Sequence, residues 1–210
     1  MTFDPKYGET LLTDEEKAAL TDEARALLGE PIRKADLYDL EQQVQNLVAD
    51  DFIEQVLASA LTIDELLTDH FVRELHRRLY APIWTWGGRQ RWRETNIGVA
   101  PEQITAAFRN SLDDLRFRWE QGDTFTAREL GISTHASLVH IHPFVDGNGR
   151  TTRLLADLVF LAAQGEGDVQ AYDWDFDRDA YFGLLQDYDG TLDPSALIAF
   201  VRVVELGEQE

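Results

Sequence analysis

Residues 142–153 read His-Pro-Phe-Val-Asp-Gly-Asn-Gly-Arg-Thr-Thr-Arg, and the fold of the chain is decided around this stretch. Apolar residues recur on both sides of it, a pattern that predicts two buried helices joined by a polar loop. Pro143 disfavours an α-helical conformation at the residue before it, so the first helix should end at His142. The apolar positions are Leu138, Val139 and Ile141 before the stretch, and Leu154, Leu155, Leu158, Val159 and Leu161 after it.

The glycine-bracketed turn in this stretch predicts an anion-binding site. Gly147, Asn148 and Gly149 can adopt tightly folded or positive-φ conformations that turn backbone N–H groups toward one point. A helix that begins near Asn148 or Gly149 adds its unsatisfied N–H groups and the positive end of its dipole. Arg150 and Arg153 are three residues apart, so they share a helix face and can both reach phosphate oxygens.

An acid and a base accompany that turn. Asp146 suits Mg²⁺, which is usually held by one or two carboxylates together with the phosphates of a substrate. His142 titrates near neutrality and can take a proton from an attacking hydroxyl. Together these groups predict phosphoryl or nucleotidyl transfer, whereas the alternative is an ordinary helix–loop–helix whose polar residues only cap and solvate. A metal pair of His140 and His142 is disfavoured, because no further acidic or histidine residue completes such a set.

Length and composition narrow the class of protein. The 210 residues fit one domain with a sizeable core, and the hydrophobic content of 44% indicates a globular chain. The net charge of −20 argues against broad binding to nucleic acid or to an anionic membrane, since both need a basic face. The charge favours solubility or a salty habitat, with an acidic face that recruits a basic partner as the alternative.

Cysteine usage and hydropathy bear on the compartment. The chain contains no cysteine, which excludes disulfides, thiolate metal sites and cysteine nucleophiles. No apolar run approaches the roughly 18 to 20 residues that span a bilayer, and no signal peptide is recognisable at the N-terminus. We therefore expect a cytoplasmic protein without a membrane partner.

The rest of the chain is predicted to be mainly α-helical. Thr62 and Glu65 are spaced as a capping box at the start of a helix. Glycine and tryptophan enrichment at 81–100 predicts a short hairpin or a loop. Residues 1–35 are expected to form an N-terminal arm. The predicted helices are 13–28, 35–60 with a possible break at 50–51, 62–80, 101–121, 126–140, 148–163, 177–188 and 193–205.

The stretch resembles the signature of Fic (Fido) domains, H-P-F-x-[DE]-G-N-G-R-x-x-R, with every fixed position filled. The resemblance implies a mainly α fold over residues 36–206, a helical bundle with a small β-hairpin "flap" at 81–100. The backbone around 94–99 would then align a hydroxyl of the target. Flanking segments, such as L-H-R-R-L-Y at 75–80 and T-N-I-G-V at 95–99, further resemble the bacterial subgroup called mobile mystery protein B.

The resemblance also implies an activity, the transfer of AMP from ATP to a Ser, Thr or Tyr hydroxyl of a target protein. Tyr188 stands where many relatives carry asparagine, which leaves the contacts to the base open. The implied roles are general base for His142, Mg²⁺ ligand for Asp146, core anchor for Phe144, phosphate binding for Gly147, Asn148, Gly149, Arg150 and Arg153, and nucleobase pocket for Tyr181 and Tyr188.

The sequence lacks a recognisable inhibitory motif of the kind found in many Fic proteins. Many Fic proteins carry an inhibitory glutamate in a motif [ST]-x-x-x-E-[GN], but here Glu166 is the only glutamate followed by Gly or Asn, and Ala162 takes the Ser/Thr position. We therefore expect any inhibition to come from a separate antitoxin-like protein, as in toxin–antitoxin pairs. A non-catalytic nucleotide- or protein-binding module and a Fic-type kinase are the alternatives; the intact G-N-G argues against the kinase.

Overall fold

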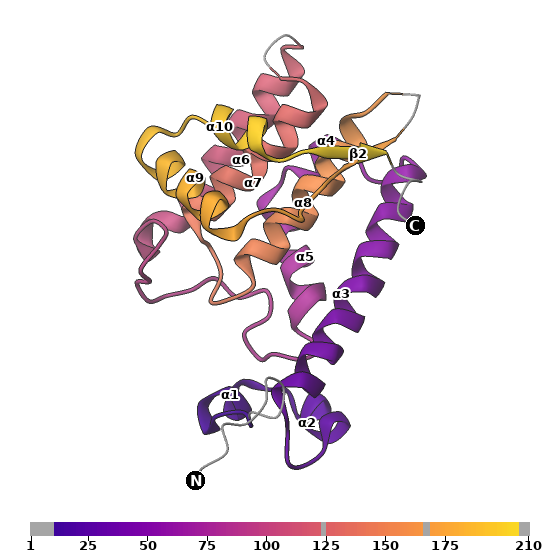
Figure 1. Ribbon diagram of the computed structural model, residues 1–210, viewed down its shortest axis with the longest axis vertical. Coiled ribbons are helices and arrows are strands. Elements are labelled where there is room, and N and C mark those ends of the chain that lie inside the picture. The colour runs from indigo at the N-terminus through magenta and orange to yellow at the C-terminus, as the bar shows by residue number, and fades with distance from the viewer. Residues whose placement is uncertain (1–10, 123–124, 166–168, 206–210) are drawn as a thin grey trace. The chain divides into compact units, whose positions relative to one another are not determined.

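The structure is a computed structural model that describes residues 11–122, 125–165 and 169–205. Within these ranges the chain is mostly helical, which confirms the predicted fold class (Figure 1). The elements are α1 (Asp14–Ala19), α2 (Asp22–Leu28), α3 (Lys34–Leu57), α4 (Ile63–Leu66), α5 (Asp69–Tyr80), a 3₁₀ turn η1 (Pro101–Gln103), α6 (Ile104–Glu120), α7 (Ala127–Ile141), α8 (Asn148–Ala163), β1 (Gln170–Tyr172), α9 (Arg178–Thr191), α10 (Ser195–Phe200) and β2 (Val203–Glu205).

The chain forms two compact units, residues 1–51 with 73–89 and residues 52–72 with 90–210. The predicted division into an arm of residues 1–35 and a domain of residues 36–206 stays a prediction. None of the helices in the described ranges is long and apolar enough to cross a membrane.

In the first unit, the single helix predicted for 13–28 is two helices. Leu20 is extended and buried between α1 and α2, where it pairs with Trp84. Thr21 then caps α2 by accepting a hydrogen bond from the Ala24 N–H at 3.1 Å, and its own N–H donates to the Ile83 carbonyl at 2.9 Å. Because Trp84 and Ile83 are more than 60 residues away from Leu20 and Thr21, the periodicity of residues 13–28 did not reveal the break.

Two other helix boundaries differ from the predictions. Helix α3 runs through residues 50–51 without a break, and the Asp51 carboxylate pairs with Arg78 at 2.7 Å. The helix predicted for 62–80 divides at Leu67, and the Thr68 hydroxyl caps the second part by accepting from the Phe71 N–H at 3.1 Å. The capping box is confirmed, since the Thr62 N–H donates to the Glu65 carboxylate at 2.9 Å.

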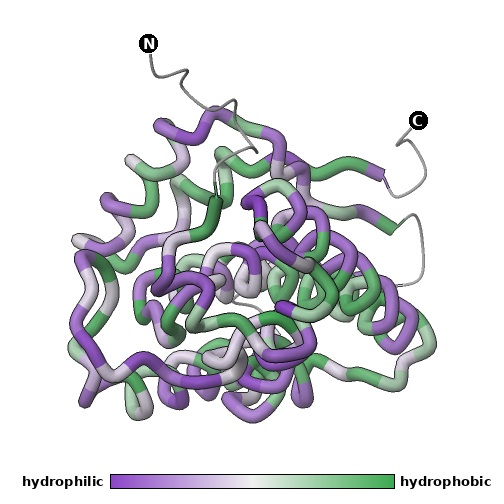
Figure 2. The backbone as a smooth tube through the Cα atoms, turned by 90° about the horizontal axis from the view of Figure 1, so that it is seen from below, coloured by the Kyte–Doolittle hydropathy of each residue, from purple (hydrophilic) through white to green (hydrophobic). Residues whose placement is uncertain are grey.

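In the second unit, α7 and α8 pack along each other at the centre of the core, as the flanks of residues 142–153 predicted (Figure 1). Nearly every described side chain of α7 from Leu130 to Leu138 is buried. Figure 2 shows hydrophobic and hydrophilic residues alternating along the helical turns, the pattern of helices with one buried face. Gly131 lets α7 approach its neighbours, because an added Cβ would lie 2.8 Å from the Ala156 carbonyl oxygen of α8.

The β structure lies elsewhere than predicted. Residues 81–100 contain no strand in the structure and form a loop, which confirms the loop alternative; the hairpin that the resemblance implied at this place is wrong. The backbone of this segment pairs instead with the end of α7, where the Arg91 N–H donates to the Pro143 carbonyl at 3.0 Å. The strands that do form are β1 and β2, antiparallel with Ala171 opposite Val204.

The last predicted helix, 193–205, ends at Phe200 and is replaced beyond it by β2. β-branched Val203 and Val204 favour an extended chain, and β1 supplies the hydrogen-bonding partner. A short apolar run of this kind does not distinguish helix from strand when its partner is far away in the sequence.

We expect Gly131→Ala to lower the free energy of unfolding by about 1–3 kcal/mol, although alanine is the better helix former. The added Cβ would lie 2.4 Å from the Tyr172 hydroxyl and 2.8 Å from a backbone oxygen. Urea titration measures the change. The control is Gly183→Ala in α9, where nothing lies within 4 Å of the added carbon and stability should rise by up to about 1 kcal/mol. Equal effects of the two substitutions would contradict the close packing.

Candidate functional site

His142 lies where the sequence places it, directly after α7. It adopts a left-handed conformation with φ 52°, and its N–H donates to the Leu138 carbonyl at 3.0 Å. Burial and the nearby Arg91 guanidinium lower the pKa of the His142 imidazole below its usual value of 6.5. A lowered pKa keeps the ring neutral near pH 7, which is the form that a general base requires.

The loop between α7 and α8 is closed by the Asn148 side chain. Its Oδ1 accepts from the Phe144 N–H, and its Nδ2 donates to the Phe144 carbonyl, both at 2.9 Å. Phe144 is fully buried and meets Phe108 edge to face, so its predicted role as an anchor is confirmed. The Asn148 side chain is thus engaged within the loop, and only its backbone N–H remains as a predicted phosphate contact.

Gly147 provides the turn into α8. Its φ of 73° lies in the left-handed region, whereas Gly149 is already in the first turn of the helix. The Asp146 Oδ1 accepts from the Gly147 N–H at 2.6 Å, and the Thr151 hydroxyl donates to the Gly147 carbonyl at 2.9 Å. This geometry directs the N-terminus of α8, with its unsatisfied N–H groups, toward the loop and so favours an anion there.

One cavity of about 730 Å³ collects the predicted groups. Of the two tyrosines predicted for the nucleobase pocket, Tyr181 lines this cavity, whereas Tyr188 lines a different one of about 290 Å³. The Tyr188 hydroxyl lies 3.0 Å from the Ser137 hydroxyl. The predicted site residues that line the larger cavity are His142, Asp146, Gly147, Asn148, Gly149, Arg150, Arg153 and Tyr181.

Aromatic side chains in the same cavity as residues 146–150 form a wall that the sequence did not reveal. The rings of Phe176 and Tyr181 stack at 4.7 Å, and Trp174 and Phe182 extend the row. All four line the cavity. The W-x-F pattern at 174–176 was the available signal, but it does not say which cavity the rings face. Aromatic rings and the N-terminus of a helix in the same cavity suit a ligand with a planar base and phosphates.

Two titratable groups, His135 on α7 and Asp157 on α8, lie close enough to Arg153 to be affected by its charge. The His135 Nε2 lies 2.6 Å from the Tyr181 hydroxyl, and burial with the Arg153 charge lowers the pKa of His135 to about 3. Burial raises the pKa of Asp157, one helical turn after Arg153, to about 7. The Trp174 Nε1–H donates to both Asp157 carboxylate oxygens at 3.0 Å. These contacts attach the aromatic wall to the helix that carries the arginines.

The residues present fit Mg²⁺ held jointly with a substrate. Among the described residues, no group of three His, Cys, Asp or Glu side chains could hold a metal by itself. Asp146 instead provides a single carboxylate on the cavity wall beside the anion site, the arrangement in which substrate phosphates complete the coordination of Mg²⁺. His140 is turned to another partner, Asp189, at 2.7 Å.

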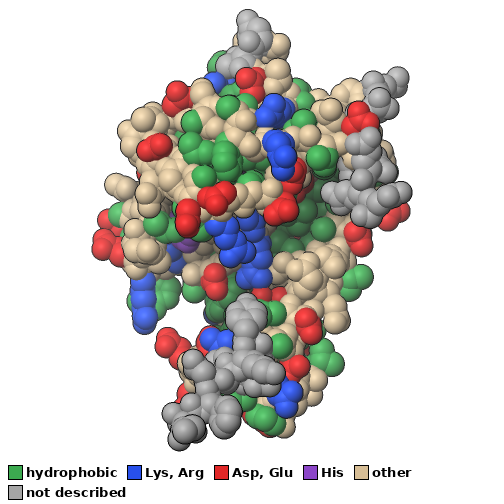
Figure 3. Space-filling view, viewed as in Figure 1, with side chains coloured by type: hydrophobic (Ala, Val, Ile, Leu, Met, Phe, Trp, Pro, Cys, Tyr) green, Lys and Arg blue, Asp and Glu red, His purple; other side chains and the backbone are tan. Residues whose placement is uncertain are grey.

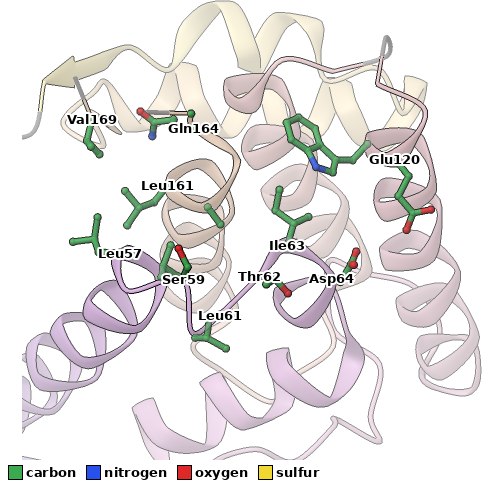
Figure 4. Close-up of a pocket in the computed structure, with 14 residues that line it drawn as sticks. Leu57, Ser59, Leu61, Thr62, Ile63, Asp64, Glu120, Leu161, Gln164 and Val169 are labelled. Atoms are coloured by element: carbon green, nitrogen blue, oxygen red, sulfur yellow. The ribbon is translucent and has the colours of Figure 1, made fainter. Parts of the chain in front are cut away.

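Two further features of the surface are a group of basic side chains and another cavity. On the face drawn in Figure 3, several Lys and Arg side chains gather in one group with Asp and Glu side chains around it, although the chain as a whole carries a net charge of −20. A cavity of about 950 Å³ between the end of α3, α4 and the end of α8 contains no residue of 142–153 (Figure 4). This cavity is therefore not the site of the predicted chemistry, although it is larger than the one that contains His142.

Comparison with known proteins found a family match. Residues 66–160 match the sequence model of the Fic/DOC family. The chain is 34% identical over 105 residues to protein adenylyltransferase fic-1 of Caenorhabditis elegans, covering 47% of this chain and 20% of the relative. Protein adenylyltransferase Fic of Drosophila melanogaster is 34% identical over 108 residues, which cover 49% and 20%. The match thus spans about a fifth of the length of these relatives.

Solved structures share the fold. BepC of Bartonella tribocorum, crystallised with AMPPNP, superposes with a TM-score of 0.60 at 13% identity, covering 87% of this chain and 99% of that one. A Fic domain containing signaling protein from Bacteroides thetaiotaomicron superposes with a TM-score of 0.58 at 25% identity, covering 74% and 59%.

We expect Asn148→Ala to lower the free energy of unfolding by about 2–3 kcal/mol, because it removes both hydrogen bonds to the buried backbone of Phe144. Thermal and urea unfolding measure the loss. Asn110→Ala, at an exposed position of α6, is the matched control and should change stability by less than about 0.5 kcal/mol. If both variants melt alike, Asn148 does not hold the loop.

Proposed function

We propose, on the premise that residues 66–160 belong to the Fic/DOC family, that the protein is a protein adenylyltransferase. It would transfer AMP from ATP to a Ser, Thr or Tyr hydroxyl of a target protein. The observation that carries this proposal is that a base, an acid and an anion site line a single cavity. The adenylyltransferase names of the relatives support the choice of AMP as the transferred group.

The geometry supports a division of roles. The N-terminus of α8, with Arg150 and Arg153, would bind the phosphates and stabilise charge on the departing pyrophosphate. The His142 Nδ1 is buried, so its Nε2 is the atom available to accept the hydroxyl proton. The hydroxyl oxygen would then form a bond to the α-phosphorus as the bond to pyrophosphate breaks. The aromatic wall with Tyr181 would hold the base.

Asp146 would hold Mg²⁺ together with the phosphates. When bound, Mg²⁺ neutralises phosphate charge and so assists departure of pyrophosphate. Asp146 itself is kept in place by the hydrogen bond from the Gly147 N–H at 2.6 Å.

The loop around 94–99 is proposed to present the target hydroxyl. Ile97 lines the cavity that contains His142 and is 44% exposed. Trp92, two residues before this loop, is 72% exposed, with the Arg93 guanidinium 4.2 Å above its ring. Exposed apolar side chains on this segment, with Ile97 at the cavity that contains His142, suit contact with a protein surface.

The regulation is part of the same proposal. A separate antitoxin-like protein would inhibit the enzyme, because the sequence has Ala162 where an inhibitory helix carries Ser or Thr. Ala162 lines the cavity shown in Figure 4, which is not the one that contains His142. Glu166 lies outside the described residues. Membership of the subgroup called mobile mystery protein B and a cytoplasmic location likewise remain predictions from the sequence.

Labelled ATP tests the transferred group. With Mg²⁺ and a cell lysate, we expect protein labelling from α-³²P-ATP and none from γ-³²P-ATP. His142→Ala should reduce labelling by about 100-fold or more, because the general base is lost. His70→Ala, an exposed histidine on α5, should label like the unaltered protein. Labelling from γ-³²P-ATP would indicate a kinase, and no labelling from either would indicate a binding module.

The Mg²⁺ requirement tests the role of Asp146. Chelation by EDTA should abolish labelling, and Asp146→Asn should raise the Mg²⁺ concentration for half-maximal labelling by about ten-fold or more, since a neutral amide is the poorer ligand. Asp113→Asn, at an exposed position of α6, should leave that concentration unchanged. The same Mg²⁺ dependence in Asp146→Asn and the unaltered protein would exclude this role.

A further inference from the structure

Arg91 is an arginine in an unusual environment. Its side chain is only 3% exposed, although burying a charged group is costly unless it is well bonded. Its partners in the described part of the chain are backbone carbonyl oxygens: Nε donates to His142 at 2.6 Å, and Nη1 donates to Arg93 at 3.0 Å. Nη2 donates to Val99 and, at 3.4 Å, to Ile141. One guanidinium thus joins both ends of a loop to the residue proposed as the base.

The contacts meet at the C-terminal end of α7, where carbonyl groups lack partners within the helix and the dipole favours a cation. Backbone bonds reinforce them, since the Arg91 N–H donates to Pro143 at 3.0 Å and the Val99 N–H donates to Ile141 at 3.4 Å. The loop 91–99 is therefore attached at both ends to residues 141–143.

Gly98 brings the loop backbone against the same place. Its φ is +95°, a conformation that favours glycine. An added Cβ would lie 2.6 Å from the His142 Cβ, 2.7 Å from the Arg91 Nη2 and 3.0 Å from the Ile141 oxygen. No side chain larger than hydrogen fits between the loop and His142 unless one of them moves.

We propose that Arg91, with Gly98, is a positioning residue that holds His142 in register with the target-presenting loop. A left-handed conformation at a non-glycine residue persists only where its surroundings enforce it, and His142 has φ 52°. The bond from the Arg91 Nε to the His142 carbonyl supplies that constraint. The inference rests on the proposed function, because it takes His142 as the base and the loop as the surface that receives the target.

Arg91 contributes both geometry and charge, and the two can be separated. The charged groups that act on His142 are Arg91, Asp146 and Asp189; the Arg91 cation lowers the pKa of the imidazole and the two carboxylates raise it. Lysine at position 91 would keep the charge without the fork that reaches several carbonyls. Methionine at position 91 would keep much of the length of the side chain and remove both the charge and the hydrogen-bonding fork.

The kinetic test compares Arg91→Lys and Arg91→Met with Arg109→Met, an exposed arginine of α6 outside the loop. We expect kcat for AMP transfer to fall about 100-fold in Arg91→Met, as for a misplaced catalytic group, and less in Arg91→Lys. The KM for ATP should stay within about two-fold, because residues 146–153 are untouched. Arg109→Met should keep the kcat of the unaltered protein. A kcat for Arg91→Met equal to that of Arg109→Met would overturn the proposal.

A titration of the His142 imidazole by NMR gives a readout that needs no activity. Its pKa should rise in Arg91→Met, because a nearby cation is lost, and stay unchanged in Arg91→Lys and Arg109→Met. If the unaltered protein transfers no AMP, the proposed function fails, while this titration still decides the contact between Arg91 and His142. An unchanged pKa in Arg91→Met would refute that contact.

Gly98→Ala keeps the proposal testable if Arg91→Met does not fold, as judged by circular dichroism. It leaves the arginine in place and pushes the loop away from His142, so kcat should again fall with the KM for ATP unchanged. Full activity in a folded Gly98→Ala variant would show that the loop and His142 need not stay in register.

Discussion

The pair of hydrogen bonds between the Asn148 amide and the backbone of Phe144 is the constraint on which the site depends. It closes the loop between two buried helices at one length, with Phe144 locked into the core. Because these bonds fix the conformation of the loop, the end of α7 and the start of α8 are held at the same cavity. His142 and the N-terminus of α8 are then brought together by helix packing, so the site inherits the rigidity of the core.

Basic groups line the candidate site of this acidic protein. The chain carries a net charge of −20, yet the cavity is lined by Arg150, Arg153 and the positive end of α8. Burial lowers the pKa of both His142 and His135, and a nearby arginine, Arg91 for His142 and Arg153 for His135, lowers it further. The same cavity thus combines positive groups, which favour an anion, with burial, which favours the neutral form of the proposed base.

Local signals in the sequence were sufficient for the elements nearest the site. The spans of α7 and α8, the break at Pro143 and the capping box at Thr62 each depend on residues within a few positions of one another. The wrong boundaries share a different cause. Leu20 is extended because it pairs with Trp84, and Val203 and Val204 are a strand because β1 lies beside them. Short segments take the conformation that their distant partners favour.

The sequence by itself determined which polar groups lie around one loop: a histidine, an aspartate, a glycine turn and two arginines at a fixed spacing. Only the tertiary structure decided which other groups join them. It directed Tyr181 into the cavity and Tyr188 away from it, turned the Asn148 side chain inward, and placed Arg91 on the His142 carbonyl across 51 positions. Spacing along a chain specifies neighbours on one helix, whereas contacts between distant segments depend on how the helices and loops pack.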